Sequence, residues 1–173
     1  MRLIECTREQ HAGAILRLLN HAIVNSTALY DYQPRSTGSM GAWFDGKAEG
    51  RFPVLGMQGE AGALLGFASY GVFRPHAAYK YMVEHSVYVD ADYRRRGVAA
   101  ALMRALIDRA RQQDYHVMVG GVDASNDASI GLHEKLGFTH AGTLRHAGFK
   151  FGRWLDLAFY QLILDTPGNP TAS

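Results

Sequence analysis

The segment 82–113 constrains the fold more than any other part of the chain. Its first part, MVEHSVYVD (82–90), is rich in β-branched and aromatic residues, which favour a central β-strand. The later part, RRRGVAAALMRALIDRARQQ (94–113), places three arginines and a glycine before apolar residues at helical spacing. A strand that passes through a basic turn into a helix predicts an α/β domain, with helices packed on the faces of a sheet.

Shorter patterns predict the other elements. Thr7, followed three residues later by Gln10, resembles a capping box that opens a helix with an apolar stripe over 15–23. Gly137 fits the end of a helix, and Gly152 fits a turn between two final strands. The other expected strands cover 2–6, 53–58, 63–70 and 117–122, and the other expected helices cover 40–47 and 126–136.

The size of the chain suits one domain. A length of 173 residues and a hydrophobic content of 47% are enough for one sizeable core. We expect that domain at 1–165 and a flexible tail at 166–173, where two prolines follow Asp165. Because helical and strand patterns are mixed along the chain, the sheet is expected to be mixed, with helices on its faces.

Charge and cysteine content exclude several classes of function. The formal net charge is only +2, so the composition does not support a nucleic-acid partner. The single cysteine, Cys6, excludes an internal disulfide and a multi-cysteine metal cluster, and we expect no metal. The start MRLIEC lacks a long apolar run, so we expect no signal peptide, no membrane partner and a cytoplasmic protein.

The basic turn at 94–97 has the composition of a phosphate site. The N-terminus of a helix exposes backbone N–H groups and the positive end of the helix dipole. Gly97 lets the chain pass close to a ligand, and the three preceding arginines can bond phosphate oxygens. No G-x-x-x-x-G-K-[ST] is present and no G-x-G-x-x-G follows a strand, which excludes two nucleotide-binding motifs. The alternative is a basic turn that only begins a surface helix.

Two separated motifs carry a resemblance to a known family. VYVDADYRRRGVAAALM (87–103) is similar to the acetyl-CoA motif of the GNAT acyltransferases, R/Q-x-x-G-x-G/A, which Arg94, Gly97 and Ala99 match. NDASIGLHEKLGF (126–138) resembles the second motif of the family at the expected distance. VEHSVYV, LHEKLGF and GFKFGRWLDLAFYQL resemble the branch that N-acetylates phosphinothricin, methionine sulfoximine and methionine sulfone.

The resemblance implies a fold, a donor and an assembly. It implies a single GNAT-like domain, acetyl-CoA as co-substrate and a homodimer, with a mostly antiparallel sheet of about seven strands and about four helices. In the family, the strand at 87–89 splays from its neighbour, and its backbone meets the pantetheine arm and polarises the thioester carbonyl. These residues can equally be plain sheet core. The residues that the resemblance assigns to acetyl-CoA are Val87, Tyr88, Val89, Arg94, Arg95, Arg96, Gly97, Val98, Ala99, Ala100, Asn126 and Lys135.

The same resemblance suggests two catalytic residues. An amine attacks a thioester only when it is neutral, so a base is required, and Glu84 resembles the catalytic glutamate of the branch. Partial burial in an apolar strand would raise its pKa towards a useful range. His133 stands where many GNAT enzymes have a tyrosine, and it could protonate the leaving thiolate or orient the amine. Alternatively, Glu84 forms an ion pair on the strand surface, and His133 only packs and bonds to a backbone carbonyl.

The acceptor site is expected just before and within the strand at 82–90. The carboxylate of an amino-acid acceptor needs a cation, and we prefer Arg74 for this role. A solvated loop is the alternative. The residues predicted to bind the substrate are Arg74, Pro75, His76, Glu84, His85 and Ser86.

The leading hypothesis is an N-acetyltransferase that moves acetyl from acetyl-CoA to the α-amine of a small methionine-like amino acid. One alternative keeps the donor but changes the acceptor to a polyamine, an aminoglycoside or a peptide N-terminus. Another is an acyl-CoA sensor without catalytic activity. A nucleic-acid-binding module that uses the arginine run is disfavoured by the nearly balanced charge.

Overall fold

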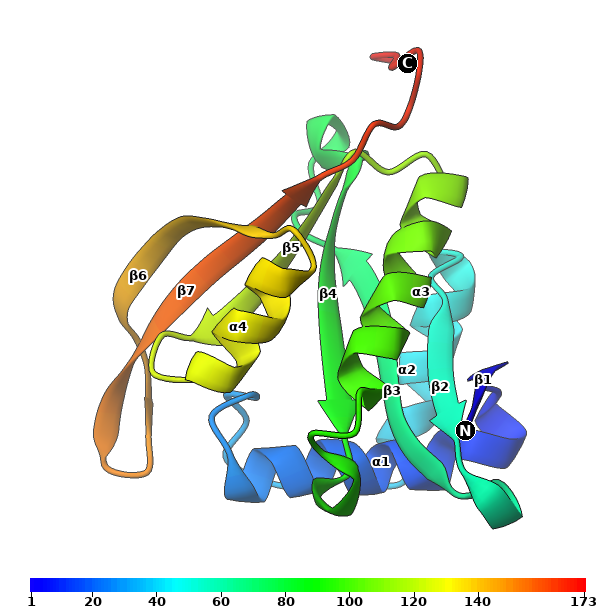
Figure 1. Cartoon of the computed structure of the whole chain (residues 1–173), viewed down its shortest axis with the longest axis vertical. Helices are drawn as coiled ribbons and strands as arrows, with labels where there is room; N and C mark the ends of the chain where they lie inside the picture. Colours follow the sequence, from blue (N-terminus) through cyan, green and yellow to red (C-terminus); the bar gives the residue numbers. More distant parts are fainter. The chain divides into compact units, whose positions relative to one another are not determined.

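The computed structural model describes residues 1–173 and contains one seven-stranded sheet and four α-helices (Figure 1). The order of strands in the sheet is β1-β2-β3-β4-β5-β7-β6. The predicted α/β fold with a mixed, mostly antiparallel sheet is therefore confirmed. The strands are β1 (Arg2–Glu5), β2 (Val54–Gln58), β3 (Leu64–Val72), β4 (Met82–Val89), β5 (Val117–Asp123), β6 (Thr139–Lys150) and β7 (Arg153–Ile163). The helices are α1 (Arg8–Asn25), α2 (Ser39–Glu49), α3 (Val98–Gln112) and α4 (Asp127–Lys135).

The chain divides into two compact units. The first contains Met1–Tyr70 and Ser86–Leu106, and the second contains Gly71–His85 and Ile107–Ser173. Strand β4 therefore contributes residues 82–85 to the second unit and residues 86–89 to the first. The predicted domain boundary at residue 165 is not tested by this division and stays a prediction.

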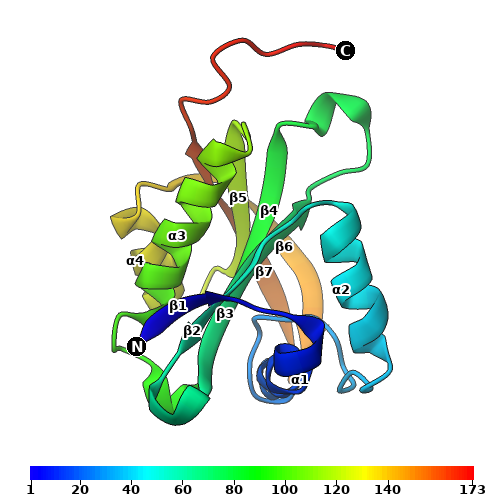
Figure 2. The same cartoon turned by 90° about the vertical axis from the view of Figure 1, so that its right-hand side faces the viewer.

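The core of the first unit forms between helices and antiparallel strands. Strand β2 pairs with both β1 and β3 in antiparallel register. Figure 2 shows α1 and α2 on one side of β2 and β3. The apolar stripe of α1 is buried as predicted, and Ile15 packs in one cluster with Met40 of α2 and Phe67 of β3. Burial of this stripe removes apolar surface from water and so stabilises the unit.

Helix α1 begins where the sequence predicts, but its cap differs in detail. The Thr7 side chain accepts a hydrogen bond from the backbone N–H of Gln10, 3.4 Å away. In a capping box the Gln10 side chain would bond the backbone N–H of Thr7. Here that N–H donates instead to Nδ1 of His11, at 2.9 Å. A histidine thus replaces the glutamine in the second half of the motif.

Replacing Thr7 with alanine is expected to lower the free energy of unfolding by about 1 kcal/mol, because one backbone N–H of the first turn loses its acceptor. Urea unfolding monitored by circular dichroism measures this change. Thr37→Ala, in the exposed loop before α2, is the control for loss of a threonine outside the cap. An unfolding midpoint for Thr7→Ala equal to that of the wild type would contradict the cap.

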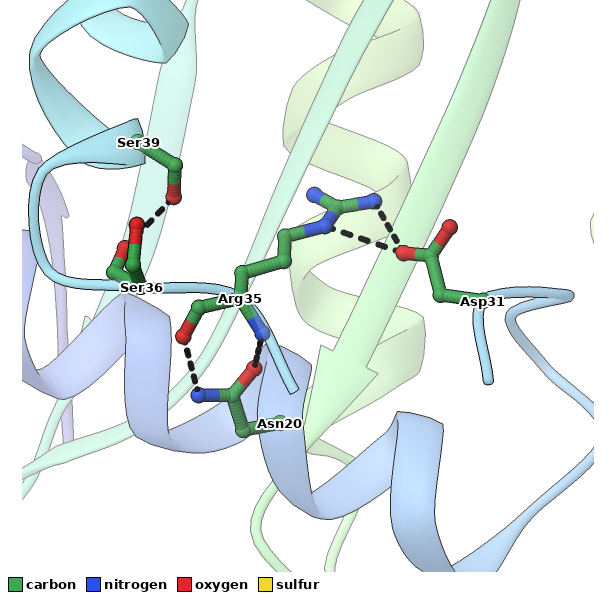
Figure 3. A network of polar contacts seen from close by, with 5 residues as sticks. All are labelled: Asn20, Asp31, Arg35, Ser36 and Ser39. Atoms are coloured by element: carbon green, nitrogen blue, oxygen red, sulfur yellow. Dashed lines mark hydrogen bonds and ion pairs between the residues drawn. The ribbon is translucent and has the colours of Figure 1, made fainter. Parts of the chain in front are cut away.

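Hydrogen bonds from Asn20 of α1 and Ser39 of α2, and one ion pair within the loop, hold the loop between these two helices (Figure 3). The Asn20 amide donates to the carbonyl of Arg35 at 3.0 Å and accepts from its N–H at 2.7 Å. The Arg35 guanidinium binds Asp31 through two nitrogens, at 2.8 and 3.0 Å. Ser39 Oγ donates to the carbonyl of Ser36 at 2.6 Å. These contacts order a region for which the sequence supports only a loop.

The second unit is built around β5. Strand β5 pairs in parallel with β4 and antiparallel with β7, and β7 pairs antiparallel with β6. The last two strands form a long ribbon in Figure 1, and Gly152, with φ +71°, lies in the predicted turn between them. This positive φ lies in the left-handed region of backbone conformation. Glycine adopts that region readily because it has no Cβ to clash with the backbone.

The C-terminal segment contacts the second unit. Thr166 Oγ1 donates to the carbonyl of Tyr115, and Tyr81 Oη accepts from the N–H of Thr171 at 2.9 Å. Lys80 Nζ donates to a terminal oxygen of Ser173 at 3.2 Å. Several groups of this segment therefore have hydrogen-bond partners in the second unit. The flexibility predicted for 166–173 stays a prediction. None of the helices has both the length and the hydropathy needed to cross a bilayer.

Candidate active site

The basic turn lies in the first unit and precedes helix α3. The helix begins at Val98, and the three arginines lie in the loop before it, which follows a short 3-10 helix at Ala91–Tyr93. Arg94, Arg95 and Arg96 are exposed to solvent. The N–H of Ala101 donates to the carbonyl of Gly97 at 3.0 Å, which leaves the preceding N–H groups of the first turn without helical partners. This loop can therefore offer both guanidinium groups and backbone donors to an anion.

Backbone conformation, rather than crowding, requires the glycine at position 97. Its φ is +79°, whereas an ideal Cβ at this position would have no atom within 4 Å. Arg95 also lies in the left-handed region, at φ +59°. Two such residues bend the loop sharply, and a non-glycine residue there is strained. The open space around Gly97 agrees with a loop that can receive a diphosphate.

The other residues of this turn differ in what they can offer. The Val98 side chain is only 2% exposed, so it packs in the core and leaves its backbone for a ligand. Ala99 and Ala100 are half-buried and keep the first turn of α3 thin. The Arg96 guanidinium lies 5.2 Å from the ring centroid of Tyr93, a distance typical of a cation–π contact. Arg96 is therefore partly held against the protein.

The segment 86–89 of β4 is half-buried in the first unit. An ideal Cβ on Gly66 of β3 would lie 2.7 Å from the carbonyl oxygen of Tyr88 and 3.2 Å from Cα of Val89. Glycine at position 66 therefore permits a close approach of the two strands. The Tyr88 ring packs 5.3 Å from that of Phe67. Val87, Tyr88 and Val89 belong to the sheet, and their predicted contact with acetyl-CoA stays a prediction.

Glu84 lies in the second unit, where the ladder between β4 and β5 ends. The last register pair in this unit is Glu84 with Val119, although β5 continues to Asp123. Its carboxylate oxygen Oε1 is 3.7 Å from an ideal Cβ built on Gly121. Burial raises the pKa of Glu84, and no neighbouring charge contributes to the shift. A desolvated carboxylate of this kind is a better base than an exposed one.

His85 and His133 meet on the other side of the same strand. Their Nε2 atoms are 3.0 Å apart, and their rings stack with an interplanar angle of 24°. Nδ1 of His133 lies 2.7 Å from the carbonyl oxygen of Ser129, which matches the carbonyl contact left open by the sequence. Burial and the neighbouring His133 lower the pKa of His85 to about 3. Burial also lowers the pKa of His133, although the bond to Ser129 opposes this shift.

Two glycines that the sequence analysis did not assign to the site lie beside these side chains, and Gly120 makes room for the histidine rings. An ideal Cβ on Gly120 would lie 2.4 Å from Nε2 of His85 and 3.1 Å from Nε2 of His133. Gly121 is the corresponding neighbour of Glu84. The signal for both was the glycine pair inside an apolar strand, VMVGGV, because an interior glycine often marks a close approach.

Most of the remaining predicted site residues lie at the surface of the second unit. Asn126 caps α4 by accepting from the N–H of Ser129 at 3.1 Å, and Lys135 is exposed at the other end of that helix. Arg74, Pro75 and His76 are exposed in the connector before β4, with the Arg74 guanidinium 5.4 Å from the ring of Phe73. Ser86, in the first unit, is half-buried. No three His, Cys, Asp or Glu side chains are grouped to hold a metal ion.

The two units each supply a different kind of chemistry. The first has an exposed basic turn before the N-terminus of α3, and the second has a desolvated carboxylate, Glu84, on β4. Exposed cations beside a helix N-terminus suit a phosphate-bearing ligand, and a desolvated carboxylate suits removal of a proton from a nucleophile.

Comparison with known proteins identifies the family to which the chain belongs. The model of the acetyltransferase (GNAT) family matches residues 20–138. The L-methionine sulfoximine/L-methionine sulfone acetyltransferase of Pseudomonas aeruginosa is 48% identical over 151 residues, which cover 87% of this chain and 88% of that protein. The chain therefore belongs to the acetyltransferase (GNAT) family, as the motifs at 87–103 and 126–138 predict.

Solved structures of acetyltransferases have the same fold as this chain. A structure from Acinetobacter baylyi ADP1 is 60% identical, with a TM-score of 0.98 over 99% of this chain and 96% of that chain. A GNAT superfamily phosphinothricin acetyltransferase from Sinorhizobium meliloti, solved in complex with acetyl-CoA, is 31% identical, with a TM-score of 0.90. It covers 94% of this chain and 88% of its own. The predicted relation to the phosphinothricin and methionine sulfoximine branch is confirmed.

Proposed function

We propose that this protein transfers acetyl from acetyl-CoA to the α-amine of a small methionine-like amino acid. Methionine sulfone, methionine sulfoximine and phosphinothricin are the acceptors with which we would begin. The family supports acetyl transfer, and the related proteins from Pseudomonas aeruginosa and Sinorhizobium meliloti support this donor and these acceptors. The observation that carries the proposal for this chain is the half-buried Glu84 carboxylate, whose pKa burial raises.

Glu84 acts as the base in this proposal. The α-ammonium group of an amino acid is mostly protonated at neutral pH and cannot attack. Glu84 accepts one proton, directly or through water, and the neutral nitrogen forms a bond with the carbonyl carbon of the thioester. The nitrogen then releases its second proton, the bond from that carbon to sulfur breaks, and the leaving thiolate takes up a proton in exchange, so coenzyme A departs as a thiol. A raised pKa brings the carboxylate closer to the ammonium in proton affinity, which favours this transfer.

The turn at 94–100 holds the diphosphate of acetyl-CoA. Arg94 and Arg95 add charge-assisted hydrogen bonds, and the first N–H groups of α3 add backbone donors. The segment 87–89 offers backbone groups to the pantetheine arm. Asn126 and Lys135 are proposed as further coenzyme A contacts. Both are exposed, although Asn126 also caps α4.

For His133 the geometry favours orientation over proton donation. Its Nδ1 faces the Ser129 carbonyl and its Nε2 faces His85, so both ring nitrogens have partners. A histidine that donates a proton to the leaving thiolate needs one N–H directed at the sulfur.

Arg74 is the proposed clamp for the acceptor carboxylate. Arg74→Met keeps an apolar side chain against Phe73 and removes the guanidinium, so the KM for methionine sulfone should rise by about 10- to 100-fold, as for loss of a charge-assisted pair. The KM for acetyl-CoA should stay within about twofold, since the donor binds elsewhere. Steady-state kinetics measure both constants. Arg17→Met, on the exposed face of α1, is the control, and an unchanged acceptor KM in Arg74→Met removes Arg74 from the site.

Thiol release from acetyl-CoA tests the proposed function. Six compounds are supplied separately: methionine sulfone, methionine sulfoximine, phosphinothricin, an aminoglycoside, spermidine and a short peptide. We expect release with the first three. Release only with a polycation or the peptide keeps the donor and overturns the acceptor. No release with any of the six, despite measurable acetyl-CoA binding, favours a sensor. The homodimer and the cytoplasmic location remain predictions, which sedimentation and cell fractionation test.

A further inference from the structure

Two histidines from distant parts of the chain form a buried pair in the second unit. His85 of β4 and His133 of α4 are 48 residues apart, and their Nε2 atoms lie 3.0 Å from each other. The side chains are 7% and 2% exposed. Phe138 packs edge-on against both rings, with centroids 5.5 and 5.2 Å away. The pair therefore has a defined apolar environment in which each ring proton needs a definite position.

The carbonyl of Ser129 determines where those protons lie. A carbonyl oxygen only accepts, so Nδ1 of His133 carries a hydrogen and donates to Ser129. In a neutral ring, Nε2 of His133 then has a lone pair and must accept. The only partner is Nε2 of His85, which therefore carries a hydrogen. Nδ1 of His85 has the remaining lone pair, and it is buried without a hydrogen-bond partner.

The other neutral arrangements are unfavourable. A hydrogen on Nε2 of His133 would leave a lone pair on Nδ1 facing the Ser129 oxygen at 2.7 Å. A hydrogen on Nδ1 of His85 would place two lone pairs against each other at 3.0 Å and leave a buried donor unsatisfied. Only one combination of tautomers makes both hydrogen bonds.

This arrangement cannot conduct a proton. A proton passed from His85 to His133 would have to leave from Nδ1 of His133, and the next atom is a backbone carbonyl oxygen, which is not a useful base. A full charge on either ring would also be desolvated in this apolar environment. The pair therefore does not exchange protons. It acts as a fixed attachment, here called an anchor, between β4 and α4.

The pair of histidines is next to Glu84 in the sequence, because His85 directly follows Glu84 on β4. Successive residues of a strand project to opposite faces, so Glu84 and His85 point to different sides of β4. On β5, Gly120 faces the His85 ring and Gly121 faces the Glu84 carboxylate. The ladder between the two strands ends at Glu84. Beyond this point backbone pairing no longer holds β4 to β5, and the histidine pair supplies a side-chain attachment between β4 and α4.

We propose that the His85–His133 pair is an anchor held in one neutral tautomer arrangement, and that His85 acts through it as a positioning residue for Glu84. This inference rests on the proposed function of Glu84 as the base. It differs from the direct contact with substrate that the sequence predicts for His85. It also assigns His133 a positioning role in place of proton donation to the thiolate.

Long-range ¹H–¹⁵N NMR of the histidine rings tests the tautomers directly at neutral pH. We expect one ring protonated only on Nδ1, which belongs to His133, and one protonated only on Nε2, which belongs to His85. The His85 signals are assigned by their loss in His85→Gln. A His133 ring that carries hydrogen on Nε2, or on both nitrogens, overturns the proposal whatever the activity.

Kinetics of matched variants test the positioning role. The amide nitrogen of glutamine can occupy nearly the place of Nε2, so His85→Gln retains the donor, whereas His85→Leu removes it. We expect His85→Leu to lower kcat about 10- to 100-fold, as for a small misplacement of a catalytic group, with the KM for acetyl-CoA within about twofold. His85→Gln should retain kcat within about threefold. His21→Gln, an exposed histidine on α1, is the control.

Two further outcomes complete the test. If His85→Leu does not fold, Gly120→Ala replaces it, because the added Cβ must displace the His85 ring while all hydrogen-bonding groups remain. Equal kcat values for folded His85→Leu and wild type, or equal impairment of the Gln and Leu variants, overturn the positioning role. If Glu84→Gln is fully active, the proposed function fails instead, and the NMR result still decides whether the tautomers are as stated.

Discussion

Glu84→Gln is expected to lower kcat by about 10²- to 10⁴-fold, the usual contribution of a general base. Glutamine has nearly the same shape and volume, so the half-buried site stays filled while the proton acceptor is lost. Acetyl-CoA affinity should change less than about twofold, because the donor-binding turn lies elsewhere in the chain. Steady-state kinetics and calorimetric titration of acetyl-CoA measure the two quantities separately.

The pH profile adds a second readout of the same residue. Burial raises the pKa of Glu84, so the carboxyl group becomes protonated, and inactive as a base, at a pH above the usual range for glutamate. The kcat/KM of the wild type should therefore fall as the pH decreases through that raised pKa. The variant has no such group. Its residual rate should instead rise up to about tenfold per pH unit while the free acceptor amine loses its proton.

Glu134→Gln is the matched control for Glu84→Gln. It removes a carboxylate from the exposed side of α4 and should leave kcat within about twofold. A fully active Glu84→Gln at neutral pH would falsify the assignment of Glu84 as the base.

Gly97→Val is expected to weaken acetyl-CoA binding by about tenfold or more, with a smaller effect on the free energy of unfolding. Glycine at this position has φ +79°, a conformation that costs other residues about 1–2 kcal/mol and a β-branched residue more. The added side chain has open space around it, so the strain falls on the loop rather than on the core. Relief of that strain moves the first N–H groups of α3. Titration calorimetry with coenzyme A measures the loss.

Gly97→Asn separates conformation from side-chain bulk. Asparagine adopts the left-handed region more readily than valine, so this variant should bind coenzyme A more tightly than Gly97→Val. Equal affinity of wild type and Gly97→Val would show that the turn does not contact the donor. Loss of binding by both variants to the same extent would point to bulk instead of backbone strain.

Much of the fold could be predicted because its signals are local. The apolar stripe of α1, the alternating residues of the strands and the glycine at 152 each depend on the period or the φ angle of a short segment. The turn at 94–97 was also visible, because its arginines and glycine are adjacent in sequence.

The candidate base was found by resemblance and not by pattern. A glutamate in a strand has no periodic signature of a catalytic role, and local grounds alone favour an ion pair at the surface. The structure gives Glu84 a desolvated position beside Gly121. That position depends on where the ladder between β4 and β5 ends, which no short segment encodes.

The sequence by itself determined the α/β class, the order of its elements, the basic turn before α3 and the family. These depend on short-range spacing and on motifs that are contiguous in the chain. Only the tertiary structure decided that His85 meets His133, that Gly120 and Gly121 receive the side chains of β4, and that His11 completes the cap of Thr7. The first two depend on the register between strands and on the packing of α4, which place residues up to 48 positions apart within hydrogen-bond distance. Local propensities do not specify such contacts, because the balance of burial and hydrogen bonding over a whole unit selects them.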